Sequence, residues 1–254
     1  MKISVITICH NSENFIANTI YSVLAQSYPD IEYIVVDGHS QDKTVEIIRS
    51  FGTRIHKWIS EPDTGLYDAL NKGIEMATGD IIGFLHSDDL FANERVIEKV
   101  AAAFEKHETD SIYGDIQYVD QENIQKILTN RKSGNFHRWK FYLGWSPPHP
   151  TFYLKRNCYL KYGLFDTSFD IAGDYDSLLR FLMKNQISTL YIPDVRVKMR
   201  VGGVSNRTMK NIRKKWREDY RAMKQNGFGN LFTLFLKTMR PIAHFRKSPK
   251  YLFE

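Results

Sequence analysis

Two adjacent carboxylates follow directly on an apolar run in the segment GDIIGFLHSDDLF, residues 79–91. The run is typical of a buried strand, and it ends in the polar group HSDD, whose last residues are Asp88 and Asp89. Like charges this close repel each other, and a hard cation such as Mg²⁺ or Mn²⁺ would relieve the repulsion. Magnesium commonly takes one or two carboxylates and leaves its other positions to substrate phosphates. The pair indicates a metal-assisted phosphate site, unless Asp88 only caps the next helix and Asp89 is solvated.

Polar residues also follow the other apolar runs of the first half. The four runs end in TICHN, VDGHS, SEPDTG and HSDD. Each ending alone could be an ordinary turn or helix cap. Together they predict a ligand site, because ligands of a parallel sheet bind beyond the carboxyl ends of its strands. The sequence shows no zinc spacing of Cys and His and no Gly-rich phosphate loop, so metal and basic side chains would have to neutralise a bound phosphate.

The elements that must position these residues alternate regularly up to residue 110. Strand-like runs cover 2–9, 31–37, 55–60 and 80–87, and helical spacing covers 12–28, 42–52, 66–79 and 94–107. This alternation predicts an α/β fold whose mostly parallel sheet carries helices on both faces. The later part is less regular, with an expected hairpin over 111–130, a short helix over 174–185 and a strand over 189–200. We expect this irregular half to select a second substrate.

Charge is distributed unevenly along the 254 residues, which have a net charge of +6. Residues 206–254 hold 13 Lys/Arg and 3 Asp/Glu, so the remainder of the chain is acidic. A basic tail on an acidic body predicts an anionic partner for the tail, either a membrane surface or nucleic acid. The two cysteines, Cys9 and Cys158, are expected to be reduced thiols in a cytoplasmic protein. The first apolar run is too short for a signal peptide, and no run approaches the roughly 20 apolar residues of a membrane helix.

Several segments, in order and spacing, resemble the inverting glycosyltransferases of family 2, which have the GT-A fold. The matching segments are SVITICHN, QSYPDIEYIVVDGHSQDKT, ISEPDTGLYDALNKGIEMATGDIIGFLHSDD and IYGDIQYVD. The branch that builds bacterial O-antigen and exopolysaccharide is the most similar one. The resemblance implies a GT-A (Rossmann-like) sheet with a nucleotide-sugar half over 1–110, an acceptor half over 111–205 and basic amphipathic C-terminal helices over 206–254.

The resemblance also implies roles at the donor side. HSDD stands at the DXD motif of the family, so that Asp88 would meet the ribose or diphosphate and Asp89 would hold the divalent cation. Asp37 matches the acid that reads the base, usually uracil. Further nucleotide-sugar contacts are implied at Thr7, Cys9, Asn11, Asp63, Asn71 and Lys72, although Lys72 could equally be a solvated helix lysine. The family commonly has Pro-Thr-Tyr-Asn where this chain has ICHN, which leaves the identity of the base open.

The acceptor side requires a base, because inverting transfer needs a carboxylate that deprotonates the attacking hydroxyl. The segment AGDYDSLLRF resembles EDYDLWLRL of the family, which implies Asp174 as the base and Asp176 as the alternative. One of the two could instead cap the helix that follows. Gly173 stands where the family often has Glu or Ala. His149 and Arg200 match positions on the acceptor side.

The resemblance therefore implies a glycosyltransferase that uses Mn²⁺ or Mg²⁺ and moves a sugar from a UDP-sugar to a hydroxyl of a lipid-linked or growing bacterial surface glycan. It would work peripherally at the inner face of the cell membrane, with its tail either on the anionic bilayer or packed on the domain. One alternative is a nucleotidyltransferase acting on sugar phosphates, which would normally show a Gly-rich, basic loop after the first strand. The other is a nucleic-acid-binding protein. That class is disfavoured, and nucleic acid is not an expected partner, because the surplus charge lies on the tail and not on the body.

Overall fold

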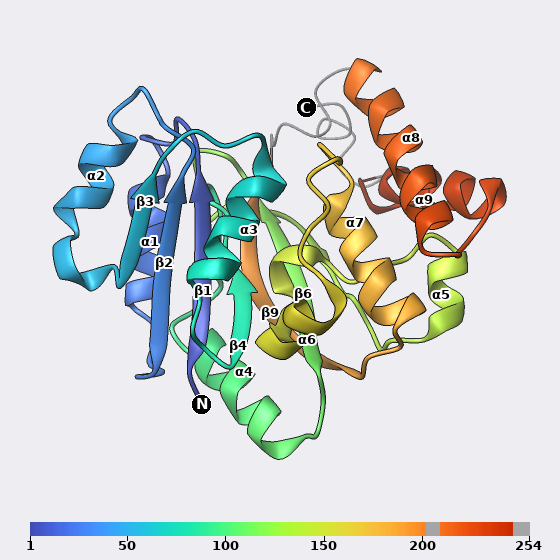
Figure 1. The fold of residues 1–254 in the computed structure, drawn as a ribbon, viewed down its shortest axis with the longest axis horizontal. Helices are drawn as coiled ribbons and strands as arrows, with labels where there is room; N and C mark the ends of the chain where they lie inside the picture. Colours follow the sequence, from blue (N-terminus) through green and yellow to red (C-terminus); the bar gives the residue numbers. More distant parts are fainter. Residues whose placement is uncertain (202–208, 246–254) are drawn as a thin grey trace.

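The computed structural model describes residues 1–201 and 209–245. Nine strands form one sheet in the order β3-β2-β1-β4-β8-β6-β9-β5, with β7 paired to β6 (Figure 1). The strands are β1 (Ile3–Cys9), β2 (Ile31–Asp37), β3 (Lys57–Ser60), β4 (Ile81–Phe84), β5 (Leu90–Phe91), β6 (Ser111–Val119), β7 (Ile127–Arg131), β8 (Tyr153–Lys155) and β9 (Thr189–Arg200). The α-helices are α1 (Ile16–Leu24), α2 (Thr44–Ser50), α3 (Leu66–Met76), α4 (Val96–Lys106), α5 (Arg138–Tyr142), α6 (Arg156–Tyr162), α7 (Gly173–Leu178), α8 (Met209–Gln225) and α9 (Leu231–Phe245).

The first half of the sheet is parallel. Strand β1 pairs with β2 and β4, and β2 pairs with β3, so that Ile3 lies opposite both Ile31 and Ile81. The second half is mixed, because β8 runs antiparallel to β4 and β6 while β9 runs parallel to β6. The expected α/β sheet of GT-A type is confirmed, and its regular parallel part is the part whose periodicity was regular in the sequence.

Helices cover both faces of the sheet because successive strand residues point to opposite sides. In β1, Val5 points to the face covered by α1, α2 and α4. Its neighbour Ile6 points to the other face, where α3, α6 and α7 pack. Both faces are packed with buried apolar side chains. Burying one such side chain stabilises the fold by about 1.5–3 kcal/mol. The result is a rigid layer that fixes the strand ends.

The strand that leads to the two adjacent carboxylates is shorter than expected and ends at Phe84. The HSDD group then forms a turn, in which the N–H of Asp89 donates to the carbonyl of His86 at 3.0 Å. Strand β5 follows, and α4 begins only at Val96, without a side-chain cap. Asp88 is therefore not the cap of that helix, and the simpler explanation for the acidic pair does not hold.

The C-terminal helices pack on the second face of the sheet. Ala222 and Met223 of α8 are fully buried in the same core as Leu178 of α7. Residues 206–208 and 246–254 of the predicted tail lie outside the described residues. Over the ranges that the structure covers, no helix is both long and apolar enough to span a membrane.

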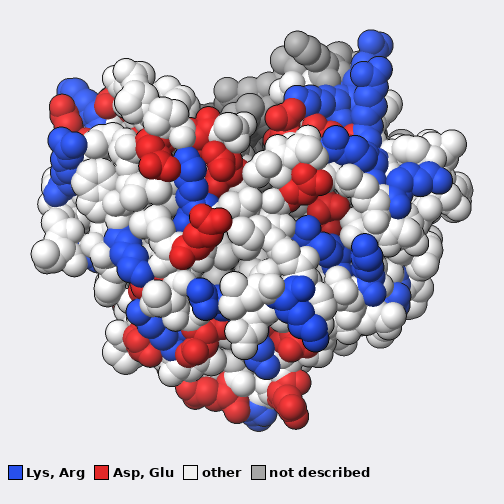
Figure 2. Space-filling model, in the orientation of Figure 1, with Lys and Arg blue, Asp and Glu red and all other residues white. Residues whose placement is uncertain are grey.

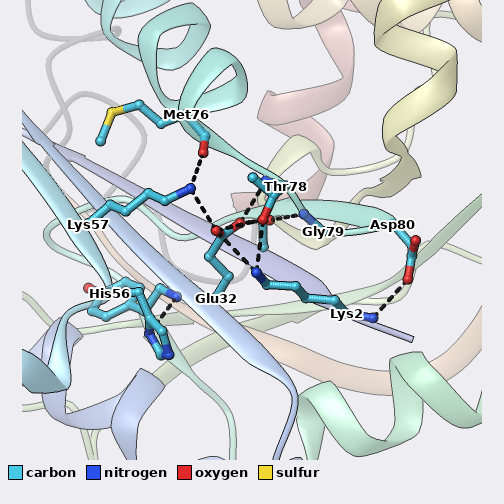
Figure 3. Close-up of polar contacts among 10 residues, drawn as sticks. Lys2, Glu32, His56, Lys57, Met76, Thr78, Gly79 and Asp80 are labelled. Carbon is cyan, nitrogen blue, oxygen red and sulfur yellow. Dashed lines mark hydrogen bonds and ion pairs between the residues drawn. The ribbon is translucent and has the colours of Figure 1, made fainter.

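A buried carboxylate joins the amino ends of the first strands, at the edge opposite the polar loops (Figure 3). Glu32 accepts hydrogen bonds from Ser4 Oγ at 2.7 Å and from the N–H of Thr78 at 2.7 Å. It also forms ion pairs with Lys57 at 2.9 Å and Lys2 at 3.3 Å. Burial alone would raise the pKa of Glu32, but these hydrogen bonds outweigh burial and hold the pKa well below its usual range.

Candidate functional site

Loops from three elements meet at the carboxyl edge of the parallel strands. Ser12, after β1, lies 2.9 Å from Ser87 of the HSDD turn through their hydroxyl oxygens. Thr19 of α1 donates to the carbonyls of Ser87 and Asp89, each at 2.8 Å. The N–H of Asn11 donates to Ser40 Oγ at 2.8 Å. Acidic side chains gather along this upper edge, above β3 and α3 (Figure 2). The strand ends therefore converge, as their sequence pattern indicates.

Asp89 is the least compensated of the buried carboxylates. Its side chain is 1% exposed, and neither carboxylate oxygen has a hydrogen-bond partner within normal geometry among the described residues. Burial raises the pKa of Asp89 well above its usual value, and the charge of Asp88 raises it further, while Arg200 opposes both. An unpaired buried carboxylate costs several kcal/mol, roughly, unless a cation accompanies it. The arrangement fits a bound divalent ion.

Arg200 supplies positive charge to this turn. Its guanidinium donates to the main-chain carbonyls of Asp88 and Gln121 and lies 4.9 Å from the ring centre of Phe15. Burial lowers the pKa of Arg200, and the two aspartates oppose that shift. The sequence pattern assigned Arg200 to the acceptor side. The structure places it against the acidic turn, where its charge acts on both aspartates, and its assignment to the acceptor side stays a prediction.

Two buried histidines lie near the acidic turn and the predicted base. Burial lowers the pKa of His86, while the charges of Asp88 and Asp174 both act to raise it, so both carboxylates are close enough to influence the same imidazole. His149 stacks on Phe84, with 5.4 Å between ring centres. Burial lowers the pKa of His149 to about 4, which leaves its imidazole neutral near pH 7. The structure thus brings Asp88, Asp174 and His149 into one region.

Asp174 lies in the first turn of α7, and the chain before it is held by two side chains. Glu218 of α8 accepts hydrogen bonds from the N–H groups of residues 170–172, the shortest being 2.8 Å from Ile171. The hydroxyl of Tyr67 donates to the carbonyl of Ile171 at 2.8 Å. A Cβ at Gly173 would come within 2.8 Å of the Tyr67 ring, so glycine is needed here. The glycine that departs from the family pattern is explained by the tyrosine behind it.

Asp176, the alternative base, faces the other way. It is 4% exposed, accepts a hydrogen bond from Asn226 at 2.7 Å and lies 3.7 Å from the guanidinium of Arg180. Burial raises the pKa of Asp176, and these partners oppose the shift. Its position joins α7 to the end of α8 and does not bring it to the acidic turn.

Asp37 is buried and engaged by the protein itself. Its carboxylate accepts hydrogen bonds from the N–H of Ser40 at 3.0 Å, from the Ser40 hydroxyl and from Ser60 Oγ at 2.7 Å. The Cys9 thiol donates to it at 3.6 Å. These bonds fix the loop that follows β2. Direct contact between Asp37 and a nucleotide base would require one of them to be given up.

Thr7 and Cys9 do not present their side chains to open space. Thr7 is fully buried and accepts a hydrogen bond from the Tyr33 hydroxyl at 3.1 Å. Burial raises the pKa of the Cys9 thiol, and nearby Asp37 raises it further, so the thiol stays protonated. Both side chains point to the face of β1 that α1, α2 and α4 cover. The alternation of side chains along a strand places them there together with Val5.

Asn11 and Asp63 lie at the open end of the same edge. Asn11 has a left-handed backbone with φ of 48° and accepts a hydrogen bond from the N–H of Gln41 at 2.9 Å. A Cβ at Gly38 would come within 2.3 Å of an Asp63 carboxylate oxygen and 3.4 Å of His10 Nδ1. The loops after β1, β2 and β3 therefore touch, and Gly38 permits this approach.

Asn71 and Lys72 of α3 hold loops in place. Asn71 exchanges two hydrogen bonds with the main chain of Phe165, each at 2.9 Å. Lys72 pairs with Glu61 at 2.9 Å and donates to the carbonyl of Pro62 at 2.8 Å, and its bond to Glu61 raises its pKa. Both side chains have protein partners that help to shape the loops, and their contacts with a nucleotide sugar stay predictions.

A metal ion here would need a substrate to supply some of its ligands. Within the two described ranges, no group of three or more His, Cys, Asp or Glu side chains is arranged to hold a metal ion. Asp88 and Asp89 offer carboxylate oxygens only, which suits Mg²⁺ or Mn²⁺ completed by phosphate oxygens and water. The residues present fit such an ion.

Sequence reasoning missed three residues that matter at this site: His86, Tyr67 and Glu218. His86 belonged to the polar group that was noticed, but the influence of Asp174 on it depends on tertiary packing. Tyr67 and Glu218 contact a loop that is far away in the sequence. No local pattern in the sequence signals these contacts.

Comparisons with known proteins agree on one family. Residues 4–173 match the model of glycosyl transferase family 2, a stretch that ends one residue before Asp174. An uncharacterized glycosyltransferase of Mycobacterium tuberculosis is 34% identical over 181 residues, covering 70% of this chain and 68% of that protein. The PGL/p-HBAD biosynthesis glycosyltransferase of Mycobacterium bovis is 27% identical over 190 residues, which cover 73% of this chain and 72% of that protein.

Solved structures share the fold. The S. aureus TarS fragment 1–349 in complex with UDP-GlcNAc has a TM-score of 0.68 at 20% identity, covering 89% of this chain and 65% of that one. The mannosyltransferase PcManGT of Pyrobaculum calidifontis, in complex with GDP-Man and Mn²⁺, has a TM-score of 0.65 at 17% identity, covering 98% of this chain and 72% of that one. Of the three classes that the sequence left open, the family match selects one: the chain belongs to glycosyl transferase family 2.

Proposed function

We propose that this glycosyltransferase is a metal-dependent inverting enzyme that moves a sugar from a nucleotide-sugar donor, most simply a UDP-sugar, to an acceptor hydroxyl. The observation that carries the proposal is the buried carboxylate of Asp89, which has no hydrogen-bond partner in the described part of the chain and lies beside Asp88 at the ligand edge of the sheet. Such a group is costly without a cation.

On the donor side, Asp88 and Asp89 would hold Mn²⁺ or Mg²⁺. The ion, when bound, neutralises the charge that develops on the leaving nucleoside diphosphate. Arg200 would add positive charge behind the turn, since its guanidinium binds the carbonyl of Asp88. The loops that carry Asn11, Asp37 and Asp63 would surround the base. TarS and PcManGT, which share the fold, bind UDP-GlcNAc and GDP-Man with Mn²⁺ respectively, which supports a nucleotide-sugar donor here.

On the acceptor side, Asp174 would take the proton from the acceptor hydroxyl as its oxygen attacks the anomeric carbon. General-base assistance of this kind contributes about 10²- to 10⁴-fold to the rate. The anchored chain before Asp174 favours a fixed approach to the sugar, because Glu218 and Tyr67 bind residues 170–172. Residues 1–110 would then serve the donor and residues 111–205 the acceptor.

The acceptor that we propose is a lipid-linked or growing bacterial surface glycan, reached at the inner face of the cell membrane. One relative carries the name PGL/p-HBAD biosynthesis glycosyltransferase, which supports a role in building surface glycans. The basic composition of residues 206–254 supports peripheral contact with an anionic bilayer.

The test is calorimetric binding of UDP with and without Mn²⁺ to the wild type and to Asp89→Asn. We expect Mn²⁺ to tighten UDP binding to the wild type about tenfold or more and to have little effect on the variant, because Asn is a poorer ligand for the ion. Asp30→Asn, at an exposed aspartate, is the matched control and should behave as the wild type. Binding of UDP that ignores both metal and mutation would contradict the metal site, and parallel titrations with GDP and dTDP show whether only the base was misassigned.

A further inference from the structure

Helix α9 turns several large apolar side chains outward, whereas Thr233 and Lys237 point inward beside Leu234. Leu231, Phe232 and Phe235 are 66%, 64% and 57% exposed. Thr233 is buried, and Lys237 points inward, where its ammonium lies 2.8 Å from buried Asp219. A helix on a water-facing surface has the opposite orientation. The outward face of α9 is therefore built to meet an apolar medium.

Helix α5 extends this surface. Trp139 and Tyr142 are 57% and 50% exposed. The two helices are in direct contact, because a Cβ at Gly144, just after α5, would come within 2.3 Å of Lys237 Cα. Tyr142 also packs on Phe228, before α9, with 4.4 Å between ring centres. Single exposed apolar residues are ordinary, but a group of large ones on adjoining helices marks an interaction surface.

The segments that carry this surface contain basic residues and no acidic ones. Residues 131–165, which include α5, contain seven Lys/Arg and no Asp/Glu, and residues 220–245, which include α9, contain four Lys/Arg and no Asp/Glu. On the visible side of the molecule, the area over α5 and α9 is white with blue side chains and without red (Figure 2). Aromatic and aliphatic groups amid basic ones are typical of a surface that binds anionic bilayers.

We propose that the outward faces of α5 and α9, carrying Trp139, Tyr142, Leu231, Phe232, Phe235 and Met239, form the surface by which the protein docks on an anionic lipid bilayer. The surface lies one helix away from the proposed base. Lys237, on the inner side of α9, lies 4.0 Å from the ring centre of Tyr175, the neighbour of Asp174, and the charge of Asp174 acts on it. A helix with its side chains is about 10 Å across. An acceptor anchored in the bilayer would meet Asp174 close to the lipid surface.

This inference rests on the proposed lipid-linked acceptor for its purpose, but the vesicle-binding assay that tests it needs neither donor nor acceptor. The wild type and the double variant Phe232→Ser/Phe235→Ser are sedimented with vesicles of phosphatidylcholine, alone or mixed with phosphatidylglycerol. We expect the wild type to bind the mixed vesicles and the bound fraction to fall with salt. The double variant should bind about tenfold less, because it lacks two aromatic groups that would enter the bilayer.

The matched control is Ile127→Ser/Leu160→Ser, which removes two apolar residues that are 52% and 62% exposed on β7 and α6. It should bind as the wild type does. Thermal melting of both variants shows that they are folded.

Absence of wild-type binding to either vesicle, or equal binding by the Phe232/Phe235 variant, overturns the proposal. So does a wild-type dimer that only this variant dissociates, because the surface would then join two copies of the chain. Transfer to a water-soluble acceptor should be unchanged in the variant, and its failure in the wild type would count against the proposed function instead.

Discussion

At the scale of single residues, three buried aspartates differ in what compensates them. Asp37 has hydrogen bonds from Ser40 and Ser60, and Asp176 has one from Asn226. Asp89 has none within normal geometry in the described ranges. A carboxylate that the protein satisfies holds structure together, whereas one left unsatisfied is costly unless a ligand completes it. This difference, which composition cannot reveal, makes Asp89 the candidate for ligand binding among the three aspartates.

The same reasoning separates the two candidate bases, and it gives a prediction. Asp174→Asn should lower kcat for sugar transfer by about 10²- to 10⁴-fold, because the amide cannot accept the hydroxyl proton. UDP binding should be unchanged, because UDP lacks the acceptor hydroxyl on which Asp174 would act. Single-turnover transfer and UDP calorimetry on the same preparations provide the measurement.

Asp176→Asn is the matched comparison. This change weakens contacts to Arg180 and Asn226, so it should lower the free energy of unfolding by about 1 kcal/mol and leave kcat nearly unchanged. If Asp176→Asn abolished transfer while Asp174→Asn retained it, the assignment of the base would be reversed.

Several residues that were predicted to contact the nucleotide sugar have side-chain partners within the protein. Asn71 is held by the main chain of Phe165, and Thr7 by the hydroxyl of Tyr33. A motif gives the position of such residues along the chain, but their partners come from distant segments. The acidic turn was predictable because its two carboxylates are adjacent. The partners of Asn71 and Arg200 were not, because they depend on how the second half folds back.

At the scale of elements, the regular first half was predictable from periodicity, whereas the support of the proposed base was not. That support comes from α8, beyond the part of the chain that matches the family. Besides the contact from Glu218, Arg221 donates to the carbonyl of Ser168 at 2.9 Å and lies 3.8 Å from the ring centre of Phe169. Helix α8 thus fixes the segment that leads into α7, and we infer that it positions Asp174.

Removing the Glu218 carboxylate should therefore affect catalysis more than donor binding. Glu218→Ala leaves the N–H groups of Ile171 and Ala172 without their acceptor. This should cost about 1–3 kcal/mol of stability. Small displacements of a catalytic group can cost about 10²-fold, so kcat should fall by about 10- to 100-fold with little change in the dissociation constant for UDP.

Glu218→Gln retains an acceptor oxygen and should recover most of the lost kcat, whereas Lys224→Ala, on the exposed side of the same helix, should have no effect. Steady-state kinetics below the melting temperature of each variant provide the measurement. If Glu218→Ala lowered only the melting temperature, with kcat per folded molecule unchanged, α8 would be a structural support and nothing more.

At the scale of the whole molecule, the two edges of the parallel strands differ in how many partners their buried carboxylates have. At the carboxyl edge, Asp89 has no hydrogen-bond partner within normal geometry among the residues that the structure describes, which costs stability. The amino edge surrounds Glu32 with two lysines and the N–H of Thr78, so that β1, β2, β3 and the loop before β4 are tied together (Figure 3). The contacts of Glu32 at the amino edge thus offset the cost in stability of the unsatisfied Asp89 carboxylate at the carboxyl edge.

This contrast predicts how stability depends on pH. The folded pKa of Glu32 lies below its unfolded value of about 4.3, so its contribution is fully present above that pH and is lost as the pH falls toward the folded pKa. Glu32→Gln should lower the free energy of unfolding by about 3 kcal/mol at pH 7, because Lys2 and Lys57 lose their buried partner. In urea titrations at several pH values, the difference between wild type and variant should shrink below about pH 4. The control Glu105→Gln, at an exposed position on α4, should follow the wild type throughout. A difference that stayed constant down to pH 3 would mean that the stabilisation comes from the shape of the side chain and not from its charge.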